Sequence, residues 1–128
     1  MKIVGVYSFK NGKKEVTKRH PTLLTEVNAV IKSVDASAHK VKVSKEKTMP
    51  GRMLYSPPSI NKAFKREFSA RGWGSIRVSC DYPTTFYVRK YKIRSKNKGA
   101  FREMDFVKEK LGIEVQFGKY AFITSARR

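Results

Sequence analysis

The sequence predicts an α/β domain, because helix-like and strand-like patterns alternate along its 128 residues. Residues 113–117 alternate apolar and polar side chains, the pattern of a strand that buries one face. Residues 22–36 and 60–71 repeat apolar side chains at helical spacing, which is typical of amphipathic helices. The sequence has no internal repeat and no composition change that would mark a boundary, so we expect a single domain over residues 1–128.

The first third of the chain predicts a strand, a turn and a helix. Residues 2–9 are rich in β-branched and aromatic side chains, and Asn11-Gly12 is a strong signal for a hairpin turn that returns the chain as far as Lys18. After Pro21, the helix predicted over residues 22–36 has Thr22 as a possible cap. We therefore expect a hairpin followed by a helix that packs its apolar face on the rest of the domain.

The remainder of the chain predicts a basic loop, a second helix and several short strands. Residues 39–52 form the basic loop, with a short strand at 41–43. The second helix is expected after Pro57-Pro58, with Ser59 as its cap and Gly72 as its end. Strand-like segments and a basic linker then lead to a hairpin. These segments are residues 76–78, 85–88 and 91–93, the linker 90–98, and the hairpin strands 104–107 and 113–117.

The charge of the chain points to a polyanionic partner. Lys and Arg number 29 against 10 Asp and Glu, a formal charge of +19. Such an excess attracts nucleic acid, although an anionic membrane surface would also attract it. The sequence contains no apolar run long enough to span a membrane, no signal-peptide pattern and no lipidation motif. We therefore expect a cytoplasmic protein that binds nucleic acid and not a membrane.

The predicted hairpin places two carboxylates and an amide together. The alternation points Glu114 and Gln116 the same way, and a loop centred on Glu109 and Lys110 would put Asp105 opposite Glu114. Opposed positions have Cβ atoms about 4.5 to 5.5 Å apart. Carboxylates that close repel each other unless a cation lies between them, and oxygen ligands suit Mg²⁺. The alternative is that these residues form the exposed face of an ordinary hairpin.

The hairpin sequence also resembles that of a known family. Asp105-Phe-Val-Lys, a short gap and Ile113-Glu-Val-Gln-Phe-Gly-Lys-Tyr are similar to the active-site hairpin of the BstYI and BglII type II restriction endonucleases. The wider PD-(D/E)XK nuclease superfamily has lysine where this group has glutamine, and here Gln116 holds that place. Further similarities occur in the same order at residues 3–12, 33–36, 44–47, 54–57, 61–65 and 72–73.

The resemblance implies a fold and a reaction. The fold would be a restriction-endonuclease-like core with a central mixed β-sheet flanked by helices. The reaction would be Mg²⁺-dependent hydrolysis of double-stranded DNA, with Asp105, Glu114 and the backbone carbonyl of Val115 holding the metal and Gln116 orienting water. The resemblance further implies a homodimer that cuts a GATC-centred palindrome, within a restriction-modification system that includes a cognate DNA methyltransferase.

Two further groups of residues follow from the resemblance. Glu26 lies on the first helix where the family carries an acid that can reach the metal, although it could equally be a solvated helix residue. The basic loop would lie beside the duplex, although charged loops are commonly only solvated. Its candidate DNA-binding residues are Lys40, Lys42, Lys45, Lys47 and Arg52.

The resemblance leaves one expectation about completeness. BstYI-like enzymes continue past the glutamine strand with further strands and loops, so we expect the carboxy-terminal part of the family fold to be missing from residues 1–128. Two alternatives to an active endonuclease therefore stay open: a truncated, inactive remnant, or a basic nucleic-acid-binding protein without catalysis.

Overall fold

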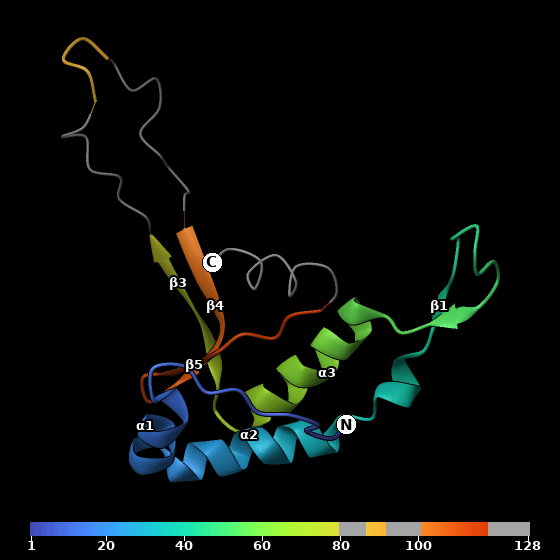
Figure 1. Ribbon diagram of the computed structural model, residues 1–128, viewed down its shortest axis with the longest axis horizontal. Coiled ribbons are helices and arrows are strands. Elements are labelled where there is room, and N and C mark those ends of the chain that lie inside the picture. Colours follow the sequence, from blue (N-terminus) through green and yellow to red (C-terminus); the bar gives the residue numbers. More distant parts are fainter. Residues whose placement is uncertain (80–86, 92–100, 118–128) are drawn as a thin grey trace.

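The computed structural model describes residues 1–79, 87–91 and 101–117, which form an α/β arrangement (Figure 1). This confirms the predicted class. The helices are α1 (Gly12–Arg19), α2 (Pro21–Ser33) and α3 (Pro57–Ala70), with a short 3-10 helix η1 (Ala36–His39). The strands are β1 (Lys42–Val43), β2 (Met53–Leu54), β3 (Gly74–Ser79), β4 (Phe101–Lys108) and β5 (Leu111–Ile113).

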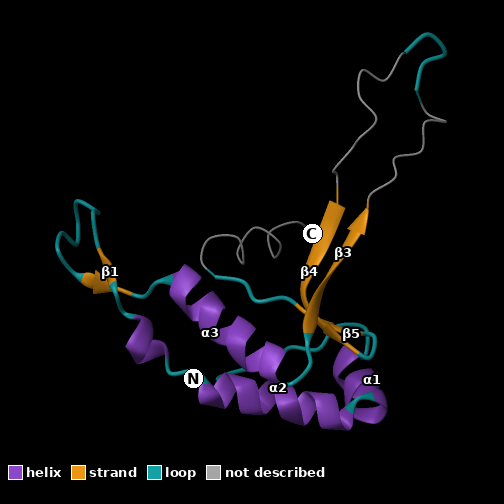
Figure 2. Ribbon diagram, turned by 180° about the vertical axis from the view of Figure 1, so that it is seen from behind, coloured by secondary structure: helices purple, strands orange, loops and turns teal. Residues whose placement is uncertain are grey.

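The strands form two separate sheets. The first is a ribbon of β1 and β2, and the second is a three-stranded sheet in the order β3-β4-β5. All pairs between these strands are antiparallel, so the parallel pairs of a mixed sheet are not found in the described ranges. Figure 2 shows that both sheets project from the same side of the layer formed by α1 and α2, with α3 between them. This side of the molecule carries the residues predicted to be functional.

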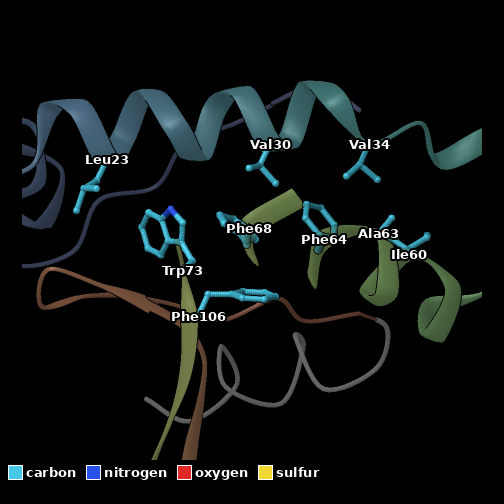
Figure 3. Close-up of a cluster of buried hydrophobic side chains, with 9 residues drawn as sticks. All are labelled: Leu23, Val30, Val34, Ile60, Ala63, Phe64, Phe68, Trp73 and Phe106. Atoms are coloured by element: carbon cyan, nitrogen blue, oxygen red, sulfur yellow. The ribbon is translucent and has the colours of Figure 1, made fainter. Parts of the chain in front are cut away.

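A cluster of apolar side chains joins α2, α3 and β4 (Figure 3). Phe68 of α3 lies at its centre, with its ring stacked on Phe106 at 4.5 Å between centroids and edge-on to Trp73 at 5.4 Å. Val30 of α2 is completely buried in the same cluster. Because Phe106 belongs to β4, this packing fixes the hairpin strand against the helices one residue from Asp105.

Both longer helices were predicted, but their caps differ from the prediction. Ser56, and not Ser59, caps α3: its hydroxyl accepts the Ser59 N–H at 3.4 Å. Thr22 lies inside α2, which begins at Pro21 after His20. Proline suits the first turn of a helix because its missing N–H would have no partner there. The prolines therefore belong to the helices instead of preceding them.

The predicted strand at residues 2–9 and its hairpin return are wrong. Residues 1–8 form no strand, and residues 12–19 form helix α1. The chain does turn nearby, since Lys10 and Asn11 have φ of 46° and 60° and Gly12 donates its N–H to the Phe9 carbonyl at 2.9 Å. Local contacts then favour the helix: the Ser8 hydroxyl accepts the Lys13 N–H at 3.0 Å. No strand pairs with residues 2–9 among the described residues, and an unpaired strand has no stable ladder.

Most of the elements predicted between β3 and β4 lie outside the described residues. These elements are the strands at residues 85–88 and 91–93 and the basic linker at 90–98. Within residues 87–91 there is no strand. Instead the Tyr91 N–H donates to the Val88 carbonyl at 2.9 Å, which makes a tight turn.

Candidate active site

The β4–β5 hairpin has the predicted two-residue loop. Glu109 and Lys110 have φ of 47° and 69°, and left-handed conformations at both loop positions are those of a type I′ turn. The last pair of the ladder is Phe106 with Ile113. The same register continued by one residue places Asp105 opposite Glu114. The loop length and register therefore agree with the expected hairpin. The strand predicted over residues 113–117 is wrong in its extent: β5 ends at Ile113 and residues 114–117 form no strand, although Val115 and Phe117 still pack against the core.

A β-bulge interrupts β4 at Asp105, which the sequence pattern did not indicate. The register with β3 shifts at this point, from Ile76↔Met104 to Gly74↔Val107. Ser75 alone therefore opposes both Asp105 and Phe106. Bulges bend a strand and redirect its side chains, and they are frequent beside active sites. Here the bulge allows Phe106 to enter the core while its neighbour Asp105 lines a hollow next to α3.

A hydrogen bond joins Asp105 to the segment that follows β5. The Val115 N–H donates to Asp105 Oδ2 at 2.9 Å. Both residues line a hollow of about 290 Å³, which is completed on the α3 side by Asn61, Lys65 and Ser69. The Asp105 residue is half-buried and borders this hollow. The Val115 N–H therefore holds the Asp105 carboxylate at the edge of the hollow.

Glu114 is electrostatically linked to Asp105. Partial desolvation of the Glu114 carboxyl, the negative charge of Asp105 and a hydrogen bond between the two carboxyl groups raise the pKa of Glu114 above its ordinary value. The residue as a whole is nevertheless exposed. Two carboxyls this close repel each other when both are ionised. A cation bound between them would offset this repulsion.

Gln116 and Glu114 both follow the end of β5. Both line a second hollow of about 570 Å³, together with Met104 and Val107 of β4. Asp105 and Val115 line the first hollow, on the α3 side. The structure therefore brings Asp105 next to Glu114 and Glu114 next to Gln116, while these residues border two different hollows of the same hairpin.

The donor atoms around the hairpin fit a hard divalent cation. Asp105, Glu114 and the Val115 carbonyl offer only oxygen, which suits Mg²⁺. No group of three or more His, Cys, Asp or Glu side chains capable of holding a metal occurs among the described residues. Two carboxylates with a main-chain carbonyl are sufficient for Mg²⁺, because this ion usually keeps several waters.

A comparison with known protein families shows to which family this chain belongs. The family described as Restriction endonuclease BglII/BglIII matches residues 4–125. The chain belongs to this family. No curated protein matches the sequence. In the described part of the chain, no helix is both long and apolar enough to cross a membrane.

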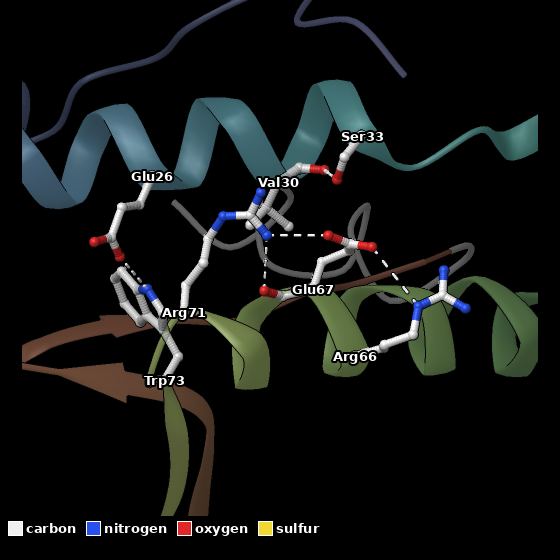
Figure 4. A network of polar contacts seen from close by, with 7 residues as sticks. All are labelled: Glu26, Val30, Ser33, Arg66, Glu67, Arg71 and Trp73. Carbon is white, nitrogen blue, oxygen red and sulfur yellow. Dashed lines mark hydrogen bonds and ion pairs between the residues drawn. The ribbon is translucent and has the colours of Figure 1, made fainter.

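Glu26, the acid expected near the metal of a BglII-type enzyme, is engaged elsewhere. Lys108 Nζ lies 2.9 Å from both of its carboxylate oxygens, and the indole N–H of Trp73 donates to it at 2.8 Å. Figure 4 shows Glu26 above Trp73, beside the Arg71–Glu67 ion pair. The structure thus places Glu26 in a network that ties α2 to β4. These partners lie 47 and 82 residues away along the chain, so no local pattern could indicate them.

The candidate DNA-binding residues of this family member lie on and around the ribbon of β1 and β2. Lys42 belongs to β1, Lys40 precedes it, and the other three are in the segment that joins the two strands. All five are exposed: Lys40, Lys42, Lys45, Lys47 and Arg52. The ribbon is held together by the Ser44 N–H, which donates to the Arg52 carbonyl at 2.8 Å. Lys40 Nζ also lies 5.7 Å from the centroid of the Tyr55 ring. Figure 1 shows the ribbon beyond the first turn of α3, projecting on the same side as β3 and β4. The ribbon and strand β4, which carries Asp105, therefore extend on the same side of α2.

Proposed function

We propose that this chain is a type II site-specific deoxyribonuclease that hydrolyses phosphodiesters of double-stranded DNA with Mg²⁺. The observation that carries the proposal is the placement of Asp105 and Glu114 across the β4–β5 hairpin, where the pKa of Glu114 is raised by desolvation and by Asp105. Membership of the BglII/BglIII family supports DNA cleavage as the reaction.

The proposed metal ligands are Asp105, Glu114 and the backbone carbonyl of Val115. When bound, Mg²⁺ polarises the scissile phosphate and lowers the pKa of a bound water. The Val115 N–H that donates to Asp105 keeps that carboxylate in one orientation. Fixing a ligand in advance reduces the conformational cost of binding.

The proposed role of Gln116 differs from that of the two carboxylates. An amide side chain cannot carry charge or take up a proton, but it offers both a hydrogen-bond acceptor and two donors. Gln116 lines the same hollow as Glu114, which supports a role in orienting the attacking water relative to that carboxyl. Its proposed part is therefore positioning for an in-line attack on phosphorus.

The basic ribbon supplies affinity for the substrate. Exposed lysine and arginine side chains bind phosphates by releasing condensed counterions, largely without regard to base sequence. The five residues of the ribbon are exposed and the whole chain has a formal charge of +19. We propose that these residues contact the duplex beside the site of cleavage.

The finer specificity rests on the resemblance of the hairpin to BstYI and BglII. On that basis the target is a GATC-centred palindrome, bound by a homodimer whose two-fold symmetry matches that of the site. A cognate DNA methyltransferase of the same restriction-modification system would protect host DNA, and the protein would act in the cytoplasm.

The second candidate function is nucleic-acid binding without cleavage. It is favoured by the positive charge, which attracts DNA whether or not the hairpin is catalytic. An inactive remnant of an endonuclease would bind in the same way. Cleavage therefore has to be measured separately from binding.

The test is incubation of supercoiled plasmid with purified protein in Mg²⁺ and in EDTA, followed by sequencing of every new end. The proposal predicts discrete fragments in Mg²⁺, intact plasmid in EDTA, and ends that share one palindrome containing GATC. Plasmid that is bound in a mobility-shift assay but never cut would favour the non-catalytic candidate. Random ends would contradict site specificity.

A further inference from the structure

Helix α3 presents a polar stripe to the hollow that contains Asp105. Asn61, Lys65 and Ser69 are spaced four residues apart, so they lie on one face of the helix, and all three line this hollow. The apolar face of the same helix carries Phe68 into the core. Because Phe68 stacks on Phe106 at 4.5 Å, the distance between the polar stripe and the β4 bulge is fixed by packed rings.

Lys65 is the one cation among the described residues that line this hollow, whereas Glu103 and Asp105 are its acids. Glu103 is already paired with Arg77 at 3.1 Å. Lys65 is exposed and forms no ion pair within the described part of the chain. Its ammonium group is therefore accessible to a negatively charged group that enters the hollow beside Asp105.

A phosphodiester brought to this hollow would need a positively charged partner from the protein. Negative charge grows on the phosphate oxygens during hydrolysis, and a preorganised cation stabilises it most strongly where water is partly excluded. Gln116 is neutral and lines the other hollow. Among the described residues at the first hollow, only Lys65 can meet this need.

We infer that Lys65 binds a non-bridging oxygen of the scissile phosphate, and so serves as the cationic residue of the site. This inference rests on the proposed nuclease function and adds a residue from a different element to the hairpin. It also gives a role to α3, whose polar face would otherwise be only solvated.

The experiment compares the parent protein with Lys65→Met, Lys65→Arg and the control Lys62→Met. Lys62 is an exposed lysine on the same helix that does not line the hollow, so its replacement removes the same charge. Binding to a 20-base-pair duplex is measured in EDTA over a range of NaCl concentrations. Single-turnover cleavage is measured in Mg²⁺, and thermal unfolding shows that each variant is folded.

The expected results separate the two lysines. Lys65→Met should reduce the slope of log affinity against log salt by about 1, as for the loss of one phosphate contact. Its cleavage rate should fall by about tenfold or more, because the reacting phosphate loses the cation that stabilises its growing negative charge. Lys65→Arg should recover part of both losses. Lys62→Met should cleave within about twofold of the parent.

Each outcome has a definite meaning. A salt slope for Lys65→Met equal to that of the parent would overturn the inference. A second outcome is that the parent protein fails to cleave while the salt slope of DNA binding is lower for Lys65→Met than for the parent and unchanged for Lys62→Met. That result would contradict the proposed nuclease function and support the phosphate contact. Equal cleavage by Lys65→Met and Lys62→Met would show that Lys65 does not bind the scissile phosphate.

Discussion

Lys108 Nζ lies 2.9 Å from each carboxylate oxygen of Glu26 and also donates to the main-chain carbonyl of Arg71 at 2.7 Å. Lys108 is the last residue of β4, Glu26 lies on α2, and Arg71 follows α3. One ammonium group therefore joins the hairpin strand to both helices, three residues from Asp105. The side chains of Lys108 and Glu26 are largely shielded from solvent, with 24% and 25% of their surfaces exposed.

We predict that Glu26→Gln lowers the melting temperature at neutral pH and that the difference disappears in acid. The hydrogen bond from Lys108, followed by that from Trp73, lowers the pKa of Glu26 below its ordinary value of 4.5. A carboxyl whose folded-state pKa is depressed stabilises the fold above its ordinary pKa, and this stabilisation is lost as pH falls through the lowered value.

The measurement is thermal unfolding from pH 7 to pH 2 for the parent, Glu26→Gln, Lys108→Met and the double variant. The two single effects should not add, because either change breaks the same contact. Additive effects in this cycle would mean that the ion pair contributes nothing to stability.

We predict that Phe68→Ala destabilises the domain by about 3 to 5 kcal/mol, the usual cost of deleting a buried aromatic ring. Phe68 is 1% exposed and contacts the rings of Trp73 and Phe106. Urea unfolding measures the change. Phe9→Ala is the matched control, because Phe9 is 67% exposed and its loss should change stability by less than about 0.5 kcal/mol. Equal effects of the two changes would contradict the described core.

We predict that Glu114→Gln raises the melting temperature in EDTA at pH 7 to 8 and has little effect near pH 4. Desolvation, together with Asp105, raises the pKa of Glu114, so its ionisation costs the folded state free energy. The stability that comes from the protonated form is present below the ordinary pKa of 4.5 and is lost as pH rises through the folded-state value. Glutamine removes that loss.

The same measurement with Mg²⁺ should reverse the order. A ligand that binds only the folded state stabilises it by mass action, and only the parent retains both carboxylates. A parent protein whose melting temperature does not respond to Mg²⁺, or a Glu114→Gln variant that is less stable than the parent in EDTA, would count against a shared cation site.

We predict that replacing Lys42, Lys45 and Lys47 together by Gln lowers the salt slope of DNA binding by about 2 to 3, since each lost phosphate contact removes about 0.9. All sequences should be bound more weakly to the same degree. The control replaces Lys13, Lys14 and Lys18, which are exposed and belong to α1, at the opposite end of the molecule from the ribbon of β1 and β2 (Figure 1). Equal slopes for the two triple variants would mean that the ribbon has no special contact with DNA.

The elements that depend on local patterns could be predicted from the sequence. The apolar spacing in α2 and α3 and the alternation after Ile113 reflect which side chains face the core, and the structure has both helices and the hairpin loop in the expected places. The strand predicted at residues 2–9 is wrong because its expected partner, the chain returning to Lys18, forms helix α1. The cap of α3 was misplaced because Ser56 and Ser59 flank the same pair of prolines.

The remainder of the candidate site depends on tertiary structure. The bulge at Asp105 exists only relative to β3, so the spacing within the hairpin could not indicate that Asp105 and Phe106 both lie on the α3 side. The partners of Glu26 come from distant segments of the chain. The polar stripe of α3 becomes a candidate part of the site only because the folded chain forms a hollow between it and Asp105. Contacts of this kind follow from how the elements pack.

The most direct measurement of the central claim is single-turnover cleavage of a GATC-containing duplex in Mg²⁺ by the parent, Asp105→Asn, Glu114→Gln and the control Glu109→Gln. Glu109 is an exposed acid in the loop of the same hairpin. The account predicts that Asp105→Asn and Glu114→Gln abolish cleavage while binding DNA as tightly as the parent or more tightly, because loss of a carboxylate removes a metal ligand and a repulsion of phosphate. Glu109→Gln should cleave at the parent rate. A folded Asp105→Asn or Glu114→Gln protein that cleaves as fast as the parent would contradict the assignment of these carboxylates.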